Sequence, residues 1–268
     1  MRQMKFAVLT LALLAGSAWA DEWSRTYNVS GTPNLKVETT DASITVDTWD
    51  KNTIEAHVTT KNYKIGEGGI TIEDKQAGDA VAIILRFPHE HLNFSFHGNR
   101  SVEINIHMPK QGHVKLHTGD GSIRVSNLKG NMELDSGDGS LEVEGVDGAL
   151  HAHTGDGHIR ADGRFDGLEI KTGDGRVDTR AETGSTLGET GWEVDTGDGS
   201  VTLEIPSNLK ADVELQSGDG HINLELPLTV EGRLKDNHLQ GKMNGGGPPL
   251  RVHTGDGSIA LKNVSGKI

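Results

Sequence analysis

Seven aspartates in this chain stand in the same four-residue phrase, Ser/Thr-Gly-Asp-Gly, and their types and spacing could do chemistry. They are Asp120, Asp138, Asp156, Asp174, Asp198, Asp219 and Asp256. If the copies stack, the carboxylates form a column that would attract Ca²⁺, a cation that prefers oxygen ligands. The phrase lacks the glycine-rich nonapeptide spacing of calcium-binding β-rolls. We therefore favour a structural turn and keep the Ca²⁺ column as the alternative.

Two glycines flank each of these aspartates and predict a tight corner. They are Gly119, Gly121, Gly137, Gly139, Gly155, Gly157, Gly173, Gly175, Gly197, Gly199, Gly218, Gly220, Gly255 and Gly257. Glycine adopts positive φ without a Cβ penalty, and aspartate can bond nearby backbone amides in an Asx turn. The Ser or Thr before each corner would point inward and form a ladder of hydroxyl groups.

Short segments of alternating apolar and polar residues surround every corner, as in Val114–Thr118 before the first one and Ile123–Val125 after it. This period of two is typical of β-strands. The first three intervals between aspartates are 18 residues each. A fixed period of this length indicates one supersecondary unit stacked on itself. We therefore predict an all-β protein.

Two architectures fit this unit, an antiparallel meander of hairpins and a β-solenoid in which each unit is one coil. In a solenoid, residues one coil apart lie about 4.8 Å from each other, so like charges there would repel. Steps of 18 residues from Arg124 reach Glu142, Arg160 and Asp178, and the signs alternate. Later coils break the rule where Glu193 would neighbour Glu214. The alternation predicts a single-stranded parallel β-solenoid (a β-helix) with coils of about 18 residues.

The first twenty residues, 1–20, read as a signal peptide. Arg2 and Lys5 precede the apolar run Phe6–Ala15, and Ala18-Trp19-Ala20 resembles a cleavage site. The apolar run is too short to span a bilayer, and no later stretch could. The chain has no cysteine, which excludes a disulfide framework and lipidation at the cleavage site. We expect an exported protein that is periplasmic, extracellular or at the cell surface.

The mature chain divides into an irregular β part at 21–112, the N-terminal cap of the solenoid, and regular coils at 113–268. Extra length enters the coils at 179–191 and 227–249, where we expect loops outside the coils. The segment Leu261–Ile268 aligns with Val125–Met132, so the chain ends as one coil closes. We expect the edge of this C-terminal coil to be covered by the second insertion, by a partner, or by self-association.

Charge and composition limit the partners. The whole chain has 26 basic and 39 acidic residues. Removal of the predicted signal peptide takes away Arg2 and Lys5 and leaves 24 basic residues, so the mature chain has a net charge of −15. This balance opposes binding to nucleic acid or to anionic lipid surfaces. Only 4% of the residues are aromatic, which weakens the case for stacking against sugars or bases.

Metal and catalytic sites were sought among the 13 histidines and the acids. His151, His153 and His158 occupy repeat positions that hold other polar residues elsewhere, so we interpret them as surface residues. His89-Glu90-His91 with His97 is the strongest remaining cluster. Nearly every acid is explained by a repeat position, and no nucleophile elbow, phosphate loop or dinucleotide fingerprint occurs. We predict no metal, no cofactor and no enzymatic activity.

Two features besides the signal peptide carry a resemblance to a known family. One is the segment Ile104–Pro109, and the other is the repeated apolar-x-apolar-x-Thr phrase followed by a Gly/Asp turn, as in Leu116–Val125. Over roughly residues 35–268 the chain resembles exported bacterial β-strand-repeat proteins of the DUF4097 type, which are often labelled adhesins. The resemblance implies a β-solenoid with a surface or adhesive role and no catalytic residues.

Two function classes follow. The first is a non-enzymatic exported scaffold, an adhesin or an envelope-associated binding protein whose partner is a protein or glycan of the cell envelope. The alternative is a carbohydrate-binding or carbohydrate-active β-helix protein of the periplasm. A groove lined by Trp or Tyr along several coils would favour the second class, and flat charged faces would favour the first.

Overall fold

The computed structural model describes residues 20–88, 100–230 and 236–264. These residues form strands β1–β21 and no helix, so none of them makes a helix that could cross a membrane, and the all-β prediction is confirmed. The predicted signal peptide, except its last residue, lies outside the described residues, and so do His89, His91 and His97.

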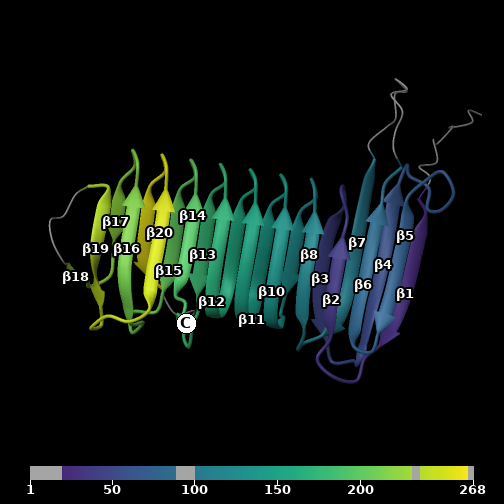
Figure 1. The fold of residues 1–268 in the computed structure, drawn as a ribbon, viewed down its shortest axis with the longest axis horizontal. Coiled ribbons are helices and arrows are strands. Elements are labelled where there is room, and N and C mark those ends of the chain that lie inside the picture. The colour runs from purple at the N-terminus through teal and green to yellow at the C-terminus, as the bar shows by residue number, and fades with distance from the viewer. Residues whose placement is uncertain (1–19, 89–99, 231–235, 265–268) are drawn as a thin grey trace, which may run out of the picture.

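The strands form two faces with the apolar core between them (Figure 1). Face A contains, in spatial order, β5 (Thr71–Ala77), β6 (Ala80–Arg86), β2 (Asn34–Glu38), β8 (His113–Thr118), β10 (Lys129–Ser136), the second halves of β11 (Leu141–Thr154) and β12 (Ile159–Thr172), β14 (Trp192–Thr196), β20 (Pro249–Thr254), β16 (Ala211–Ser217), β19 (His238–Met243) and β18 (Thr229–Val230).

Face B contains, in spatial order, β1 (Glu22–Asn28), β4 (Thr53–Lys61), β7 (Ser101–Pro109), β3 (Ser43–Trp49), β9 (Ile123–Ser126), the first halves of β11 and β12, β13 (Val177–Ala181), β15 (Val201–Ile205), β21 (Ile259–Asn263) and β17 (Ile222–Leu224). Strands β11 and β12 run round the corner between the faces and so join both into one sheet.

The middle of the stack has the register that the 18-residue period predicts. Leu116 pairs with Leu134, Leu134 with Ala152, and Ala152 with Ile170, all between parallel strands. On face B, Arg124, Glu142, Arg160 and Asp178 are successive neighbours in the same way. The residues whose charges alternate in the sequence are therefore neighbours in adjacent coils of the structure.

A single parallel solenoid is nevertheless the wrong description of the whole chain, because the sheet is mixed. At one end β5 pairs antiparallel with β6, β4 with β7, and β1 with β4. At the other end β19 pairs antiparallel with β16 and with β18. Antiparallel neighbours can be joined by short turns, whereas parallel ones need a crossover. The end strands thus cover the parallel stack at both ends of face A and at the N-terminal end of face B, whereas β17 ends face B on the other side.

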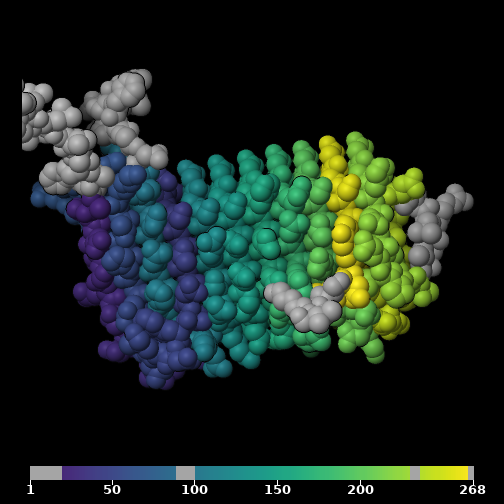
Figure 2. Space-filling view, turned by 180° about the vertical axis from the view of Figure 1, so that it is seen from behind, coloured from purple at the N-terminus to yellow at the C-terminus, as the bar shows by residue number. Residues whose placement is uncertain are grey.

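The C-terminal coil, β20 and β21, does not lie at the end of the stack. Strand β20 is paired with β14 on one side and β16 on the other, and β21 lies between β15 and β17. In the space-filling view this coil is the yellow stripe with green on both sides (Figure 2). The expected free edge of the C-terminal coil is therefore absent, and with it the predicted route to self-association through that edge.

The N-terminal coil, β2 and β3, is inserted in the same way. Strand β2 lies between β6 and β8, and β3 lies between β7 and β9. It appears as a purple stripe between blue and teal in Figure 2. The first and last parallel coils in chain order are thus held inside the stack, each between coils distant in sequence, whereas β1 lies at the outer edge of face B.

The second predicted insertion, 227–249, is part of the sheet rather than a loop outside it. It contains β18 and β19, and Leu239 and Met243 of β19 are buried in the core. Residues 231–235 within it lie outside the described residues. Because β19 pairs with the outer edge of β16, this segment covers the last parallel coil of face A.

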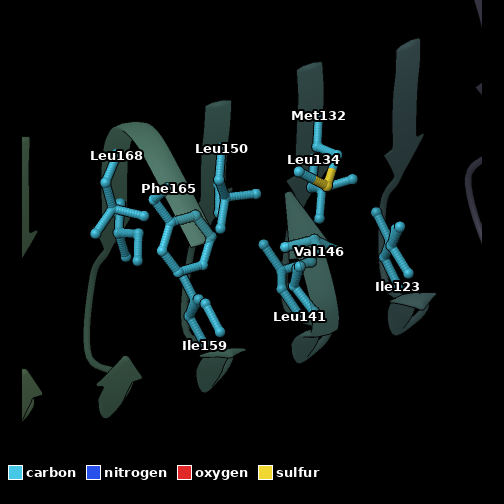
Figure 3. Packing of buried hydrophobic residues seen from close by; sticks show 14 of the residues in the cluster. Ile123, Met132, Leu134, Leu141, Val146, Leu150, Ile159, Phe165 and Leu168 are labelled. Atoms are coloured by element: carbon cyan, nitrogen blue, oxygen red, sulfur yellow. The ribbon is translucent and has the colours of Figure 1, made fainter. Parts of the chain in front are cut away.

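The core is a single layer of aliphatic side chains contributed alternately by the two faces. Leu134 and Leu150 point inward from face A and meet Leu141 and Ile159 from face B (Figure 3). Phe165, at the corner within β12, is fully buried and lies edge-on to Trp192, with ring centroids 6.4 Å apart. The charged residues of the coils point to the outside, whereas Ser and Thr side chains such as Thr154 are buried with the aliphatic layer.

Candidate binding surface

The Gly-Asp-Gly segments connect strands of face A to strands of face B, in one row along an edge of the stack (Figure 1). The reason for their glycines differs from the prediction. None of the fourteen corner glycines has a positive φ. Instead, a Cβ on Gly157 would lie 2.1 Å from the carbonyl oxygen of Gly139 in the next coil. The positive φ angles occur at the opposite corner, at Gly130 and Gly148.

Close backbone contact between coils explains this requirement. The amide of Gly155 donates to the carbonyl of Gly137 at 2.5 Å, and Gly173 donates to Gly155 at the same distance. The parallel ladder thus continues through the turn, where a side chain would push the coils apart. Equivalent contacts recur at the other corners, and glycine is needed at both positions for lack of space.

The hydroxyl before each corner, rather than the aspartate, makes the turn's side-chain hydrogen bonds. Thr154 Oγ1 accepts from the amide of Gly157 at 3.3 Å and donates to the carbonyl of Gly139 at 2.9 Å. The inward hydroxyl ladder is therefore as expected. The seven corner aspartates are exposed, and in the described part of the chain their side chains make no hydrogen bond or ion pair.

No metal centre is built from these groups. Within residues 20–88, 100–230 and 236–264, no three His, Asp or Glu side chains are placed to hold an ion together. The corner carboxylates project singly from successive coils, so the Ca²⁺ column stays a hypothesis without a geometric site. The cluster at His89–His91 lies outside the described residues.

Face A carries two rows of ionisable side chains that run across the strands. The first row is Lys75, Lys36, Lys115, Glu133, His151, Glu169, Glu193, Arg251 and Glu214, with Ala82 between Lys75 and Lys36. The second row is Glu38, His117, Asp135, His153, Lys171, Asp195 and His253. Several neighbours pair along each row, as His151 does with Glu169 at 2.9 Å and Lys115 does with Glu133.

Asp135 is the best connected carboxylate of the second row. One oxygen lies 2.9 Å from Nδ1 of His117 and the other lies 2.9 Å from Nδ1 of His153. Partial burial raises the pKa of Asp135, but the hydrogen bonds to His153 and His117 outweigh it and hold the pKa below its usual range. Asp195 and His253 form a second such contact at 2.9 Å.

The inserted C-terminal coil resolves the break in the predicted charge alternation. Arg251 lies between Glu193 and Glu214, and its Nε is 3.6 Å from the Glu214 carboxylate. The two acids are therefore not neighbours. The Glu193–Glu214 mismatch in the sequence is consistent with this insertion, although Glu169 and Glu193 are neighbours in the same row with no cation between them.

A groove crosses face A near its N-terminal end, and sequence reasoning missed it. It has a volume of about 930 Å³ and extends from β5 across β6, β2, β8 and β10 to β11. Its floor is made of small or neutral side chains: Ala77, Ala80, Asn34, Asn131 and Ala149. Lys75, Lys36 and Lys115 line it together with His113, His151 and Glu133. Chain order hides this site, since its lining residues come from five separate segments of the sequence.

The exposed aromatic platform that would favour sugar stacking is not found in this groove, whose lining includes no Trp, Tyr or Phe. Trp49, a partly exposed tryptophan, is already in contact with other groups. The ring of His107 stacks on it at 5.2 Å, and the Lys51 ammonium lies 4.0 Å from its ring centroid. The described surface thus offers charged rows and one lysine-lined groove.

The fold and this surface together define an all-β protein of stacked strand pairs with polar outer faces. The Toastrack DUF4097 family model matches residues 96–190 and 186–262, more than half of the chain, and the chain belongs to this family. The family resemblance in the sequence is thereby confirmed. No curated protein matches the chain in sequence.

Several solved structures are similar over most of their length. A proposed cell adhesion protein from Clostridium sporogenes is 15% identical with a TM-score of 0.41, covering 92% of this chain and 100% of that one. A proposed adhesin from Bacteroides fragilis is 11% identical with a TM-score of 0.41, covering 91% and 97%. A proposed lipid-binding protein from Parabacteroides distasonis is 12% identical with a TM-score of 0.38, covering 90% and 96%.

Proposed function

We propose that this protein is a non-enzymatic exported scaffold that binds a component of the cell envelope through its outer faces. The observation that carries the proposal is the pairing of outward side chains along rows, such as His117–Asp135–His153, which builds long ordered polar surfaces. A rigid stack of coils held at both ends suits display of such surfaces. The predicted signal peptide supports action in the periplasm or outside the cell.

The distribution of acids supports a role without catalysis. Glycoside hydrolases need two carboxyl groups facing one another across a substrate site. The groove on face A is lined by a single carboxylate, Glu133, which is paired with Lys115. Most other acids of the parallel coils point outward in the rows or at the corners.

Binding of the folded mature chain, residues 21–268, to isolated envelope fractions tests the proposal. We expect saturable binding to at least one of peptidoglycan, surface polysaccharide or outer-membrane material, with the same affinity in Ca²⁺ and in EDTA. Absence of binding to every fraction would contradict the scaffold role. Binding that requires Ca²⁺ would instead support the column of corner aspartates.

The alternative of carbohydrate binding draws support from the groove on face A. Its length across several strands suits an extended chain, whereas the lack of aromatic lining does not suit stacking of neutral sugar rings. A carbohydrate recognised there would have to be bound by charge and hydrogen bonds.

A further inference from the structure

The groove on face A combines a floor of short side chains with one row of cations. Ala77, Ala80 and Ala149 contribute no bulk beyond a methyl group, so the floor lies below the neighbouring row of long side chains. Six strands cross beneath it, which gives a length of about 24 Å at about 4.8 Å between strands. The groove is therefore long, open and shaped for an extended molecule rather than a compact one.

Two cations of this groove are direct neighbours, whereas the like-charge neighbours Glu169–Glu193 and Glu144–Asp162 are pairs of acids. Lys36 of β2 lies directly opposite Lys115 of β8, the only place in the described strands where two cations face each other across a strand pair. Like charges in this position are destabilising. Positions that break a folding rule without a structural gain are where functional sites are expected.

Charge in the groove is also opposite to that of the protein. Its lining carries Lys36, Lys75 and Lys115 against one acid, Glu133, whereas the whole chain has a formal net charge of −13. In the described part of the chain Lys75 has no ion-pair partner, and its neighbour across the strand pair is Ala82. Lys36 is paired only within its own strand, with Glu38 at 2.6 Å. The Lys75 ammonium is thus available to a ligand, and the exposed Lys36–Glu38 pair can be exchanged for one.

We propose that this groove binds an acidic polysaccharide, a glycan chain with a carboxylate on its repeating sugars, and this inference rests on the proposed envelope-binding function. The lysines pair with the carboxylates, and the side chains of Asn34, Asn131 and His113 hydrogen-bond hydroxyl groups along the floor. A peptide could add as a strand only at the outer edge of β5, at one end of the groove, because β6, β2, β8 and β10 are paired on both sides. A recessed groove does not fit a flat lipid surface, and nucleic-acid bases find no aromatic side chain on which to stack.

Titration of the folded mature protein with an oligogalacturonate long enough to cross the six strands tests the proposal. We expect saturable binding that weakens as salt is added. Exchange of Lys36, Lys75 and Lys115 together for Gln should weaken it by roughly tenfold or more, since three charge-assisted contacts are lost. The matched control exchanges Lys171, Lys210 and Lys262 for Gln, which lowers the net charge equally outside the groove and should change the affinity by less than about twofold.

A second pair of variants tests shape without changing charge. Ala82→Trp fills the groove and should abolish binding, whereas Ala260→Trp, at an outward position on face B, should not. Circular dichroism and urea unfolding confirm that each variant is folded. Equal weakening by both lysine triples, equal binding of the fully methyl-esterified oligosaccharide, or binding only to anionic phospholipid vesicles would overturn the proposal.

Separate results would contradict the envelope-binding function and the acidic-glycan site. If the oligogalacturonate does not bind while envelope fractions bind equally to the wild type and the groove variants, the acidic-glycan site is wrong and the scaffold role stands. If neither the probe nor any envelope fraction binds, both proposals are wrong.

Discussion

The side chain that fixes each Gly-Asp-Gly corner is the buried hydroxyl that precedes it. Thr154 bonds one backbone group within its own turn and one in the adjacent coil, and so couples the two. The aspartate between the glycines points to solvent. At the scale of single residues, the corner is therefore stabilised from inside the coil and its outer position is free to vary.

Substitutions at one corner should separate these roles. Gly157→Ala should destabilise the fold by about 1–3 kcal/mol, because the new Cβ meets the Gly139 carbonyl at 2.1 Å. Asp156→Asn should stay within about 0.5 kcal/mol, since this exposed side chain makes no hydrogen bond or ion pair in the described structure. Urea unfolding measures the free energy of both variants. Equal losses of stability would contradict the conclusion that glycine is needed because a Cβ has no room.

Protonation of Asp135 should contribute to acid unfolding. Its pKa is lowered in the folded state, so it adds stability that is fully present above the unfolded value of about 3.9 and is lost as the pH falls through the lower folded value. Asp135→Asn should therefore flatten the decline of the unfolding free energy below about pH 4. Urea unfolding from neutral to acidic pH measures this slope, and a profile parallel to that of the wild type would refute the contribution.

At the scale of strands, the two sides of each strand have unequal importance. Leu134 is 1% exposed and packs in the layer shown in Figure 3, whereas its neighbour Glu133 is exposed and paired with Lys115. Leu134→Ala should cost about 2–5 kcal/mol by leaving a cavity. Glu133→Ala should cost about 0.5 kcal/mol or less, as is usual for an exposed ion pair. Similar urea midpoints for the two variants would show that the inside and outside are wrongly assigned.

The segment with β18 and β19 should behave as a cap. Deletion of Thr229–Gly247 removes the partner of β16 and leaves its N–H and C=O groups unpaired at a free edge. We expect faster hydrogen exchange of the β16 amides and association that grows with protein concentration. Light scattering and exchange measurements report both. A monomeric variant with unchanged exchange would mean that the segment is a peripheral loop, as the sequence first suggested.

At the scale of the whole molecule, the first and last parallel coils in chain order, β2–β3 and β20–β21, each lie between strands that are distant from them in the sequence. The inserted coil β20–β21 separates β14–β15 from β16–β17, so it carries every parallel contact of the last coil. Contacts over such sequence separation are expected to slow folding, since long loops must close first.

Removal of residues 249–268 should therefore be more damaging than the loss of one terminal coil. Without β20 and β21, strands β16 and β17 lose their parallel neighbours, and Glu193 would face Glu214 if the gap closed. We expect residues 211–243 to lose protection in hydrogen exchange while residues 113–172 keep it. Full protection of residues 211–243 in the truncated chain would show that the inserted coil is dispensable.

The sequence alone determined the features that depend on neighbours along the chain. The alternation of Leu116, Leu134 and Ile170 with polar residues placed the strands and the core, because successive side chains in a strand point to opposite faces. The repeat placed the corners and their hydroxyls, and the charge series from Arg124 gave the register of the middle coils.

Tertiary structure alone decided the order of the coils and hence the groove. The coils share one apolar pattern, so each could stack on any other, and local sequence does not specify which neighbours it takes. Covering the sheet edges favours antiparallel end strands, which moves β2–β3 and β20–β21 inside the stack. Only this order brings Lys36 beside Lys115 and Arg251 between two glutamates, since these contacts join residues far apart in the chain.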